Sequence, residues 1–420
     1  MPASPSTARA INDRLALRLL QQEGPLTAGQ LKQLTGLSRP TVADLVERLT
    51  VAGLISVVGE SGEQRRGPNA RLYGIVADRA QLAALDVRTE GVTVVVADLL
   101  GAELARASVP ITDDAGTGPA VEQAVALVER AAKEAGAERL HTVGVGAPGL
   151  IDPASGELRD SSGLPAWHRR LVAALQERLP ARVIVENETN LAALAEQRDG
   201  AARDRDTFVL LWLGHGTGAA VVLDGRLRRG ASGGTGEIGF LPVPGTATLP
   251  SATDCEGGFH SLAGGAAIAG LAAAYGLTAT ESGGEPPAAA LVRAAVAAVT
   301  PPAAPSSASS RSSASSRPSA ADPSPYGPSD RFLSALADRL AVGAASVVAV
   351  LDPGCVVLGG EVGQAGGEEL AARVGERLAR MSPLPAEVRA GVLGGGAVLR
   401  GALLTARESA QDDLFTPHPR

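Results

Sequence analysis

The pattern of apolar and polar residues changes its period along the chain. Over residues 9–54, apolar side chains recur every three or four positions, which is the spacing of one face of an α-helix. From residue 80 onwards, short apolar runs such as "GVTVVVADLLG" alternate with helical stretches, a pattern typical of α/β proteins. The sequence therefore predicts a small, mainly helical head followed by an α/β body.

Three helices are expected in the head. The first carries an apolar stripe with members four positions apart, at Ile11, Leu15 and Leu19. The second, "LTAGQLKQLTG", can begin at the N-cap Thr27 and end at Gly36. The third follows a further N-cap, Ser38. Its expected inner face is Val42, Leu45, Val46 and Leu49.

The order of these elements predicts a winged helix-turn-helix. Two short helices are joined by "TGLS", and the segment "ISVVGESGEQRRGPNARLYGIV" predicts two strands around a polar loop. In this motif the second helix enters the major groove and the wing contacts the DNA backbone or minor groove. The residues expected to contact DNA are Ser38, Arg39, Thr41, Asp44, Arg65 and Arg66. A small helical module that binds another protein is the alternative.

Charge is distributed unevenly between the two parts. The 420-residue chain has a formal net charge of −7, yet residues 1–76 hold nine basic and six acidic side chains. A basic head on an acidic body suits a protein that presents only its head to nucleic acid. Two cysteines a hundred positions apart exclude a disulfide framework. Without a leader pattern or a convincing membrane span, we expect a cytoplasmic protein without membrane contact.

Composition also marks the limits of the domains. Residues 301–330 are rich in Pro, Ser and Ala and cannot bury enough apolar surface to order themselves. The sequence therefore predicts a disordered tail over 1–8, a winged helix-turn-helix domain over 9–76, and an α/β domain over 80–410. The disordered insertion 301–330 would lie within the last of these.

Four motifs of the body resemble those of the ROK family. They are "LDVRTEGVTV", "VGAPGLID", "VENETNLAALAE" and "LGHGTGAAVVLDGRLRRGASGGTGEIG". The resemblance covers nearly the whole chain and implies a two-lobed α/β fold of the actin-like, sugar-kinase (ribonuclease-H-like) type, with a cleft between the lobes. Members with a winged head are typically sugar-responsive transcription regulators. Members without one are typically ATP-dependent sugar kinases.

The first phosphate loop departs from the family pattern. At the position that this stretch resembles, family kinases typically carry Asp-x-Gly-Gly-Thr, whereas this chain has Asp86-Val87-Arg88-Thr89-Glu90. Side chains replace the glycines that let the backbone approach phosphates, and Glu90 would repel them. The loop Gly214–Gly218 keeps its glycines, which a tight turn between strands also explains. We therefore expect a body that does not use ATP.

The segment "VENETN" lies where a buried strand is expected to end. At the position that this segment resembles, family kinases carry Asn-Asp, in which the Asp is the general base. This chain has Asn187-Glu188 instead. The extra methylene moves the carboxylate by about 1 Å, a misplacement that can cost on the order of 10²-fold in rate. We expect Asn187 and Glu188 to be a retained sugar-binding pair and no residue to be catalytic. An Asn/Glu helix cap without a ligand is the alternative.

Other family contacts to the sugar and to zinc are altered. Residues Gly236–Phe240 resemble the family motif Gly-Glu-x-Gly-His, but only Glu237 is kept and Phe240 replaces the His. A second family motif, Asn-Leu-Pro-Gly-Trp, has Gly163 in place of its Asn. One cysteine in "ATDCEGGFHSLAGG" cannot build the usual four-ligand zinc site. We expect no metal and no cofactor, with Phe240 and Phe259 packed into the vacated space. The candidate ligand-binding residues are Asn187, Glu188, Glu237 and Gly163.

Together the head and the resemblance predict a DNA-binding transcription regulator, most simply a repressor. Its partners would be a double-stranded DNA operator and a small carbohydrate effector. The symmetry of operators and the family resemblance imply a homodimer or homotetramer. The alternatives are an active sugar kinase with an added DNA-binding head, and a ligand-independent DNA-binding dimer.

Overall fold

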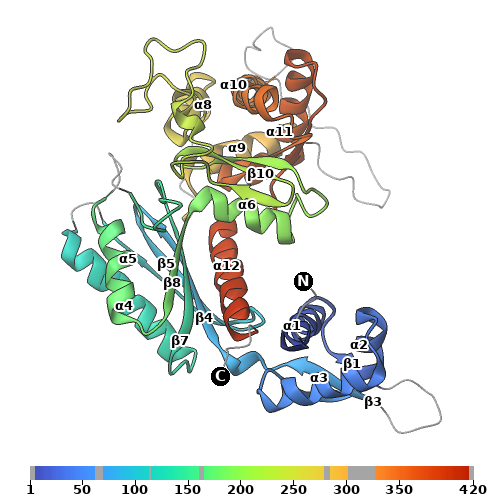
Figure 1. Ribbon diagram of the computed structural model, residues 1–420. Coiled ribbons are helices and arrows are strands. Elements are labelled where there is room, and N and C mark those ends of the chain that lie inside the picture. The colour runs from blue at the N-terminus through green and yellow to red at the C-terminus, as the bar shows by residue number, and fades with distance from the viewer. Residues whose placement is uncertain are drawn as a thin grey trace, which may run out of the picture.

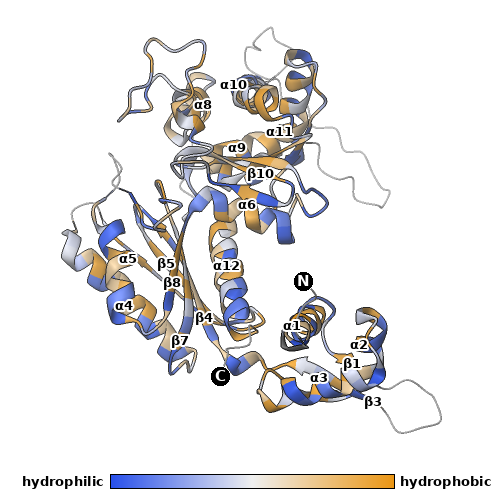
Figure 2. Ribbon diagram, in the orientation of Figure 1, coloured by the Kyte–Doolittle hydropathy of each residue, from blue (hydrophilic) through white to orange (hydrophobic). Residues whose placement is uncertain are grey.

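The computed structural model divides the chain into a head and a two-lobed body (Figure 1). It describes residues 5–61, 70–112, 115–159, 165–278, 284–300 and 327–415. The strands of both lobes carry mainly hydrophobic residues, as expected for sheets that are covered on both faces (Figure 2).

The head is a helical unit closed by a three-stranded sheet of order β1-β3-β2. Its elements are α1 (Pro5–Glu23), β1 (Leu26–Thr27), α2 (Ala28–Thr35), α3 (Arg39–Val51), β2 (Ile55–Ser61) and β3 (Ala70–Ile75). The predicted helix-turn-helix and wing strands are confirmed. Thr27 caps α2 in a capping box with Gln30, and Gly36 ends this helix in the left-handed conformation at φ 69°. The buried residues of α3 are those expected: Val42, Leu45, Val46 and Leu49.

Helix α1 differs from the prediction in two respects. It begins at Pro5, so residues 5–8, which were expected in a loose tail, are helical. Proline is compatible with the first turn because the N–H there has no acceptor within the helix. The buried face of α1 is Ala16, Leu17 and Leu20, whereas Ile11 and Leu15 are 58% and 39% exposed. Both stripes have helical spacing, and packing against α2, α3 and β3 selects between them.

The first lobe is built on a sheet of order β6-β5-β4-β7-β8. Its first three strands are antiparallel, and β7 and β8 run parallel to β4. Helices α4 and α5 cover one face and α12 covers the other (Figure 1). The elements are η1 (Ala77–Arg79), β4 (Gln81–Arg88), β5 (Gly91–Asp98), β6 (Glu103–Pro110), α4 (Thr117–Glu134), β7 (Leu140–Ala147), α5 (Trp167–Arg178), β8 (Arg182–Asn187), η3 (Gly394–Gly396) and α12 (Ala397–Leu414).

The second lobe repeats this strand order in a sheet of order β11-β10-β9-β12-β13. When the strands of each lobe are numbered along the chain from one to five, both sheets have the order 3-2-1-4-5. This repeat confirms the predicted two-lobed α/β fold. The elements are α6 (Glu188–Asp199), β9 (Phe208–Leu213), β10 (Thr217–Leu223), β11 (Arg226–Arg228), η2 (Ile238–Phe240), α7 (His260–Ala263), α8 (Gly265–Ala274), α9 (Pro287–Val299), α10 (Pro328–Leu351), β12 (Cys355–Gly359), α11 (Gly360–Met381) and β13 (Glu387–Ala390).

Helix α10 is long and apolar enough to cross a membrane by length and composition alone. Its buried face includes Phe332, Leu336 and Leu340, which belong to the core of the second lobe. This interior position accounts for its composition. Because α10 begins at Pro328, the last residues of the predicted insertion 301–330 are helical, again with proline in the first turn. Residues 301–326 lie outside the described residues.

Helices α6 and α12 lie side by side between the two lobe sheets (Figure 1). The head packs onto the far end of α12, and one hydrophobic cluster runs from Leu17 and Leu20 of α1 to Phe415. An ion pair between Arg14 of α1 and Asp412 of α12 joins the same two helices. Thus α12 extends from the space between the lobes to the head.

Candidate functional site

The first candidate surface is the N-terminal end of α3. Ser38 caps the helix: its Oγ accepts a hydrogen bond from the Thr41 N–H at 3.3 Å and lies 2.8 Å from Thr41 Oγ1. The side chains of Ser38 and Arg39 are exposed, and Thr41 is half-buried. The structure therefore brings three predicted DNA contacts together at an accessible helix end, where they can meet base edges or phosphates.

The other predicted DNA contacts are placed differently. Asp44 forms an ion pair with Arg48 one turn later in α3, and Arg48 Nη2 also lies 2.5 Å from Asp13 Oδ1 of α1. A base that donates to Asp44 would therefore share this carboxylate with Arg48. Arg65 and Arg66 lie outside the described residues.

The second candidate site lies between the lobes, where Arg88 ends β4. Its Nε donates to Asp86 Oδ2 at 3.0 Å, its Nη1 to Glu361 Oε1 at 2.6 Å, and its Nη2 to the carbonyl of Gly395 at 3.1 Å. Glu361 belongs to α11 of the second lobe, so the guanidinium bridges the two lobes. This cationic bridge occupies the loop in which family kinases have glycines.

Asp86 is buried on the same face of β4 as Arg88. Alternate residues of a strand share a face, and Leu82 and Ala84 on this face pack in the core that contains α12. Asp86 is 6% exposed, and its Oδ1 has no hydrogen-bond partner among the described residues. Burial raises the pKa of Asp86, against the opposing charge of Arg88.

Glu188, the first residue of α6, completes a cluster of carboxyl groups. It is half-buried, and its removal from water raises its pKa to about 8. Repulsion from Asp86 acts in the same direction, while Arg88 opposes it. The carboxyls of Glu361 and Glu237 also face Glu188 closely enough to raise its pKa. The Arg88 guanidinium therefore bonds two carboxyl groups, Asp86 and Glu361, and lies near a third, Glu188, so the site disfavours anions.

Asn187 acts as the N-cap of α6. Its Oδ1 accepts hydrogen bonds from the N–H groups of Thr189 at 2.9 Å and Asn190 at 3.3 Å, and its Nδ2 donates to the carbonyl of Gly149 at 2.9 Å. The segment "VENETN" is thus the junction of β8 and α6, and the amide of Asn187 mainly builds that junction. Gly163 lies outside the described residues.

Sequence reasoning missed Glu186, the buried neighbour of Asn187. Its Oε1 accepts from the N–H of Asn187 and from Asn190 Nδ2, both at 2.9 Å. Its Oε2 accepts from Arg229 Nε at 2.6 Å. Arg229 follows β11 of the second lobe, so this pair forms a further bridge between the lobes. The sequence contains no pattern that links Glu186 to Arg229, which lies 43 positions further along the chain.

Glu237 precedes η2 and is exposed at the edge of this cluster. The residue that replaces the family histidine, Phe240, is 38% exposed, so its predicted packing into a vacated site is wrong; Phe259 is fully buried, as expected. Phe240 lies at the end of a short turn, which leaves its ring outside the lobe core. Among the described residues, no group of three or more His, Cys, Asp or Glu could hold a metal ion.

Gly214, in the turn between β9 and β10, leaves room for the side chain of Glu361. A Cβ at Gly214 would lie 2.8 Å from Glu361 Oε2 and 3.1 Å from Trp212 Nε1. The N–H of Gly214 donates to the carbonyl of Gly216 at 3.1 Å and closes the turn. The glycine loop therefore serves a tight turn and the close approach of Glu361.

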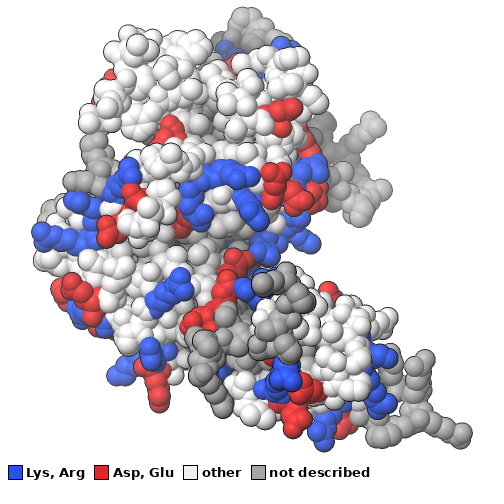
Figure 3. Space-filling model, viewed as in Figure 1, with Lys and Arg blue, Asp and Glu red and all other residues white. Residues whose placement is uncertain are grey.

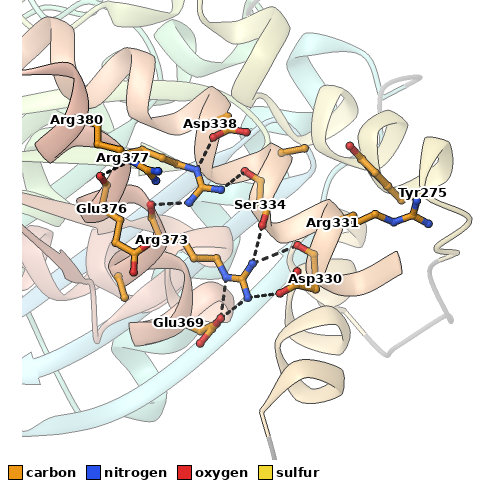
Figure 4. A pocket seen from close by; sticks show the side chains of 12 residues that line it. Tyr275, Asp330, Arg331, Ser334, Asp338, Glu369, Arg373, Glu376, Arg377 and Arg380 are labelled. Atoms are coloured by element: carbon orange, nitrogen blue, oxygen red, sulfur yellow. Dashed lines mark hydrogen bonds and ion pairs between the residues drawn. The ribbon is translucent and has the colours of Figure 1, made fainter. Parts of the chain in front are cut away.

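A separate groove of about 610 Å³ lies between α10 and α11 (Figure 4). Arg373 there contacts Asp330 at 2.7 Å and Glu369 at 2.6 Å, and Arg377 contacts Asp338 at 2.5 Å. Because these arginines are bound by carboxylates of the groove itself, the groove joins two helices and offers no excess charge to a ligand.

The chain is similar to known proteins in both of its parts. Residues 82–409 match the ROK family and residues 11–67 match the MarR family. The DNA-binding transcriptional dual regulator NagC of Escherichia coli (strain K12) is 28% identical over 243 residues, 56% of this chain and 58% of that protein. The match therefore spans less than two thirds of the length of this curated relative.

Two solved structures are similar in fold to all or part of the chain. A ROK family transcriptional regulator, described as a homolog of the E. coli MLC protein, has a TM-score of 0.72 at 20% identity, covering 97% of this chain and 98% of that chain. A ROK hexokinase from Thermus thermophilus has a TM-score of 0.57 at 28% identity, covering 79% and 99%. Relatives thus include both regulators and kinases. Since the ROK match covers most of its length, the chain belongs to the ROK family.

Proposed function

We propose that this protein is a sequence-specific DNA-binding transcription regulator, acting as a repressor, whose body senses a carbohydrate and does not phosphorylate it. The capped helix-turn-helix with Ser38 and Arg39 exposed supports the DNA-binding part. The similarity to NagC, a DNA-binding transcriptional dual regulator, supports it independently. A DNA operator as partner is consistent with a cytoplasmic location.

The contact between Arg88 and Glu361 is the observation that carries the sensor part. A polyphosphate entering at this loop would meet Glu361, together with Asp86 and Glu188, whose raised pKa values leave part of these two groups uncharged. Two like charges about 4 Å apart repel by roughly 4 kcal/mol at an effective dielectric constant near 20. The same carboxyl groups can accept hydrogen bonds from sugar hydroxyls, since these carry no charge.

Helix α12 offers a route from the cleft to the head. Arg88 binds the Gly395 carbonyl immediately before α12, and Asp412 near its other end pairs with Arg14 of the head. Eighteen helical residues span about 27 Å, at 1.5 Å per residue. A ligand that binds two lobe arrangements with different affinities would thereby shift the head as well.

A homodimer or homotetramer would place two heads on one operator. Two recognition helices read half-sites about one helical turn of DNA apart, so small changes in the spacing of the heads change affinity strongly. A change in the angle between the lobes would therefore change the affinity of the oligomer for its operator.

An active sugar kinase is the second candidate, favoured by the similarity to the ROK hexokinase. Glu188 would have to be the general base. With a pKa of about 8, only about a tenth of this carboxyl is ionised at pH 7, which lowers the share of molecules in which it can accept a proton from a sugar hydroxyl. This weighs against the kinase.

The test is fluorescence anisotropy of the full chain on the DNA upstream of its own gene, at fixed salt, with a panel of uncharged sugars. Specific binding that one sugar releases is the expected result. A coupled ATP assay with the same sugars provides the counter-test. Turnover that disappears in Glu188→Gln would contradict the proposal and establish the kinase.

A further inference from the structure

A cavity of about 520 Å³ lies where the head meets the body. Its volume falls within the range of small-molecule pockets, about 300–1,000 Å³. The head lines it with residues that include Gln21 and Gln22 of α1, and the body lines it with Arg198, Arg400 and Arg407. Figure 3 shows basic and acidic side chains gathered along the hollow between the head and the body. We call this cavity the junction site.

The three arginines of the junction site come from the two helices between the lobes. Arg198 lies in the last turn of α6, while Arg400 and Arg407, seven positions apart, share one face of α12. Arg198 Nη2 donates to Glu408 Oε1 at 2.5 Å, and Arg400 Nε donates to Asp199 Oδ2 at 2.6 Å. Two of the three guanidinium groups therefore have a carboxylate partner.

Arg407 has no carboxylate partner among the described residues. Its Nη1 donates to the carbonyl of Leu100 at 3.1 Å, and its Nε is buried without an acceptor. Burial lowers the pKa of Arg407, and the positive charges of Arg400 and Arg198 lower it further, while the carboxylates of Asp199 and Glu408 act in the opposite direction. The cations repel one another, so an anion placed among them would relieve both the repulsion and the unmet hydrogen-bonding capacity of Arg407.

The junction site differs in charge from the other two sites of the molecule. The cleft has the Arg88 guanidinium beside Asp86, Glu361 and Glu188, and the groove between α10 and α11 pairs Arg373 and Arg377 with its own carboxylates. The junction site has three guanidinium groups for two carboxylates. Planar guanidinium groups bind phosphate through paired N–H donors, and amides such as those of Gln21 and Gln22 suit hydroxyl groups.

We propose that the junction site binds a small phosphorylated metabolite whose phosphate group is held by Arg407 and Arg400. This ligand is distinct in charge from the uncharged sugar assigned to the cleft. Because α1 and α12 both line the site, a bound phosphate ester contacts the head and the body at once. The site thus gives the protein a second input, independent of the cleft.

The test is isothermal titration calorimetry of the full chain at constant ionic strength, with inorganic phosphate and glucose 6-phosphate as probes. We expect both to bind and Arg407→Gln to weaken binding at least tenfold. Arg400→Gln, a second variant, should weaken it as well. The matched control is Arg380→Gln on α11, whose guanidinium, among the described residues, bonds the Glu376 carbonyl of its own helix; the affinity of this variant for the probes should equal that of the wild type.

Three outcomes would overturn the proposal. One is that neither probe binds. Another is that affinity stays unchanged in both Arg407→Gln and Arg400→Gln. The third is that binding is lost in Arg88→Ala and retained in Arg407→Gln, which would place the phosphate in the cleft. If neither probe binds while Arg407→Gln weakens binding of a random DNA duplex, the arginines contact DNA phosphates instead. None of these outcomes depends on whether a sugar releases operator DNA.

Discussion

Arg88 of β4 and Glu361 of α11 are 273 positions apart in the chain, yet their side chains meet at 2.6 Å. Arg88 belongs to the first lobe and Glu361 to the second. Since Arg88 also binds Asp86 and the Gly395 carbonyl, one side chain connects a buried strand, the second lobe and the start of α12. A direct contact between the two lobes is therefore made by a residue at the loop whose sequence departs from the kinase pattern.

The first prediction is that Arg88→Ala destabilises the body. The change leaves the carboxyl groups of Asp86 and Glu361 without their cation. Breaking a buried ion pair costs about 3–5 kcal/mol, and the Arg88 side chain is 31% exposed, so we expect a loss of about 2 kcal/mol. Thermal unfolding followed by circular dichroism should show a midpoint lower by several degrees.

Arg106→Ala is the control for this change. Arg106 pairs with Glu103 at 2.8 Å on the surface, with side chains 55% and 46% exposed. Such pairs contribute at most about 1 kcal/mol. Equal losses in the two variants would show that the Arg88 bridge has no special role in holding the lobes together.

The second prediction concerns Gly214, which leaves room for Glu361. Gly214→Ala places a methyl group 2.8 Å from Glu361 Oε2, so the carboxylate that holds Arg88 through Oε1 must shift. We expect a lower unfolding midpoint and a weaker response to the effector sugar. Gly270→Ala in α8 is the control, because a Cβ there meets nothing within 4 Å. It should stabilise by about 0.5–1 kcal/mol through higher helix propensity.

The local structure of the head could be predicted because its signals are local. Thr27 and Ser38 are N-caps whose side-chain acceptors serve backbone groups within three residues. The strands of the two lobes could be predicted for the same reason, because each is a short apolar run that is recognisable without its neighbours. The buried face of α1 was not predictable in this way, since the stripe with Ile11 and the stripe with Leu17 both have helical spacing. Packing against the rest of the head decided between them.

The contacts of the cleft depend on tertiary structure and gave no such signal. The sequence placed Glu188 at a strand end but contained no indication that Arg88 would reach Glu361, or Arg229 reach Glu186. A lone charged residue is usually solvated, and only the fold brings these partners together. The position of Arg407, which has no carboxylate partner among the described residues, was equally hidden, because Arg198 and Arg400 approach it from two helices.

The third prediction is a pH dependence of stability that originates at Glu188. Its pKa rises from the ordinary 4.5 to about 8 in the folded protein. Between about pH 5 and pH 8 the folded protein holds a proton that the unfolded chain releases, so stability falls as pH rises through this window. Glu188→Gln mimics the protonated form, and its unfolding midpoint should decline less between these pH values. Burial of Asp86 leaves part of the slope in both proteins.

The control for the pH series is Glu157→Gln, a change at an exposed loop carboxylate. Its midpoint should follow the wild-type curve. A Glu188→Gln curve that runs parallel to the wild type over the whole window would contradict the raised pKa.

The fourth prediction is that Arg39→Ala weakens operator binding. Arg39 is exposed at the start of α3, where a recognition helix meets base edges or phosphates. Loss of such an arginine contact costs about 1–3 kcal/mol, or roughly fivefold to 150-fold in affinity. Fluorescence anisotropy at fixed salt measures it, with Arg170→Ala on α5 of the body as control. Unchanged affinity in Arg39→Ala would remove α3 as the recognition helix.

The last prediction separates ligand sensing from DNA binding. Glu237 is exposed at the edge of the carboxyl cluster, far from the head in the chain, so Glu237→Ala should keep operator affinity within about twofold. Loss of a hydrogen bond between a charged carboxylate and a sugar hydroxyl costs about 1.5–3 kcal/mol. The sugar concentration for half-release of the operator should therefore rise at least tenfold. Glu256→Ala, a nearby exposed carboxylate, should behave like the wild type. Normal release in Glu237→Ala would exclude this carboxylate from the sugar site.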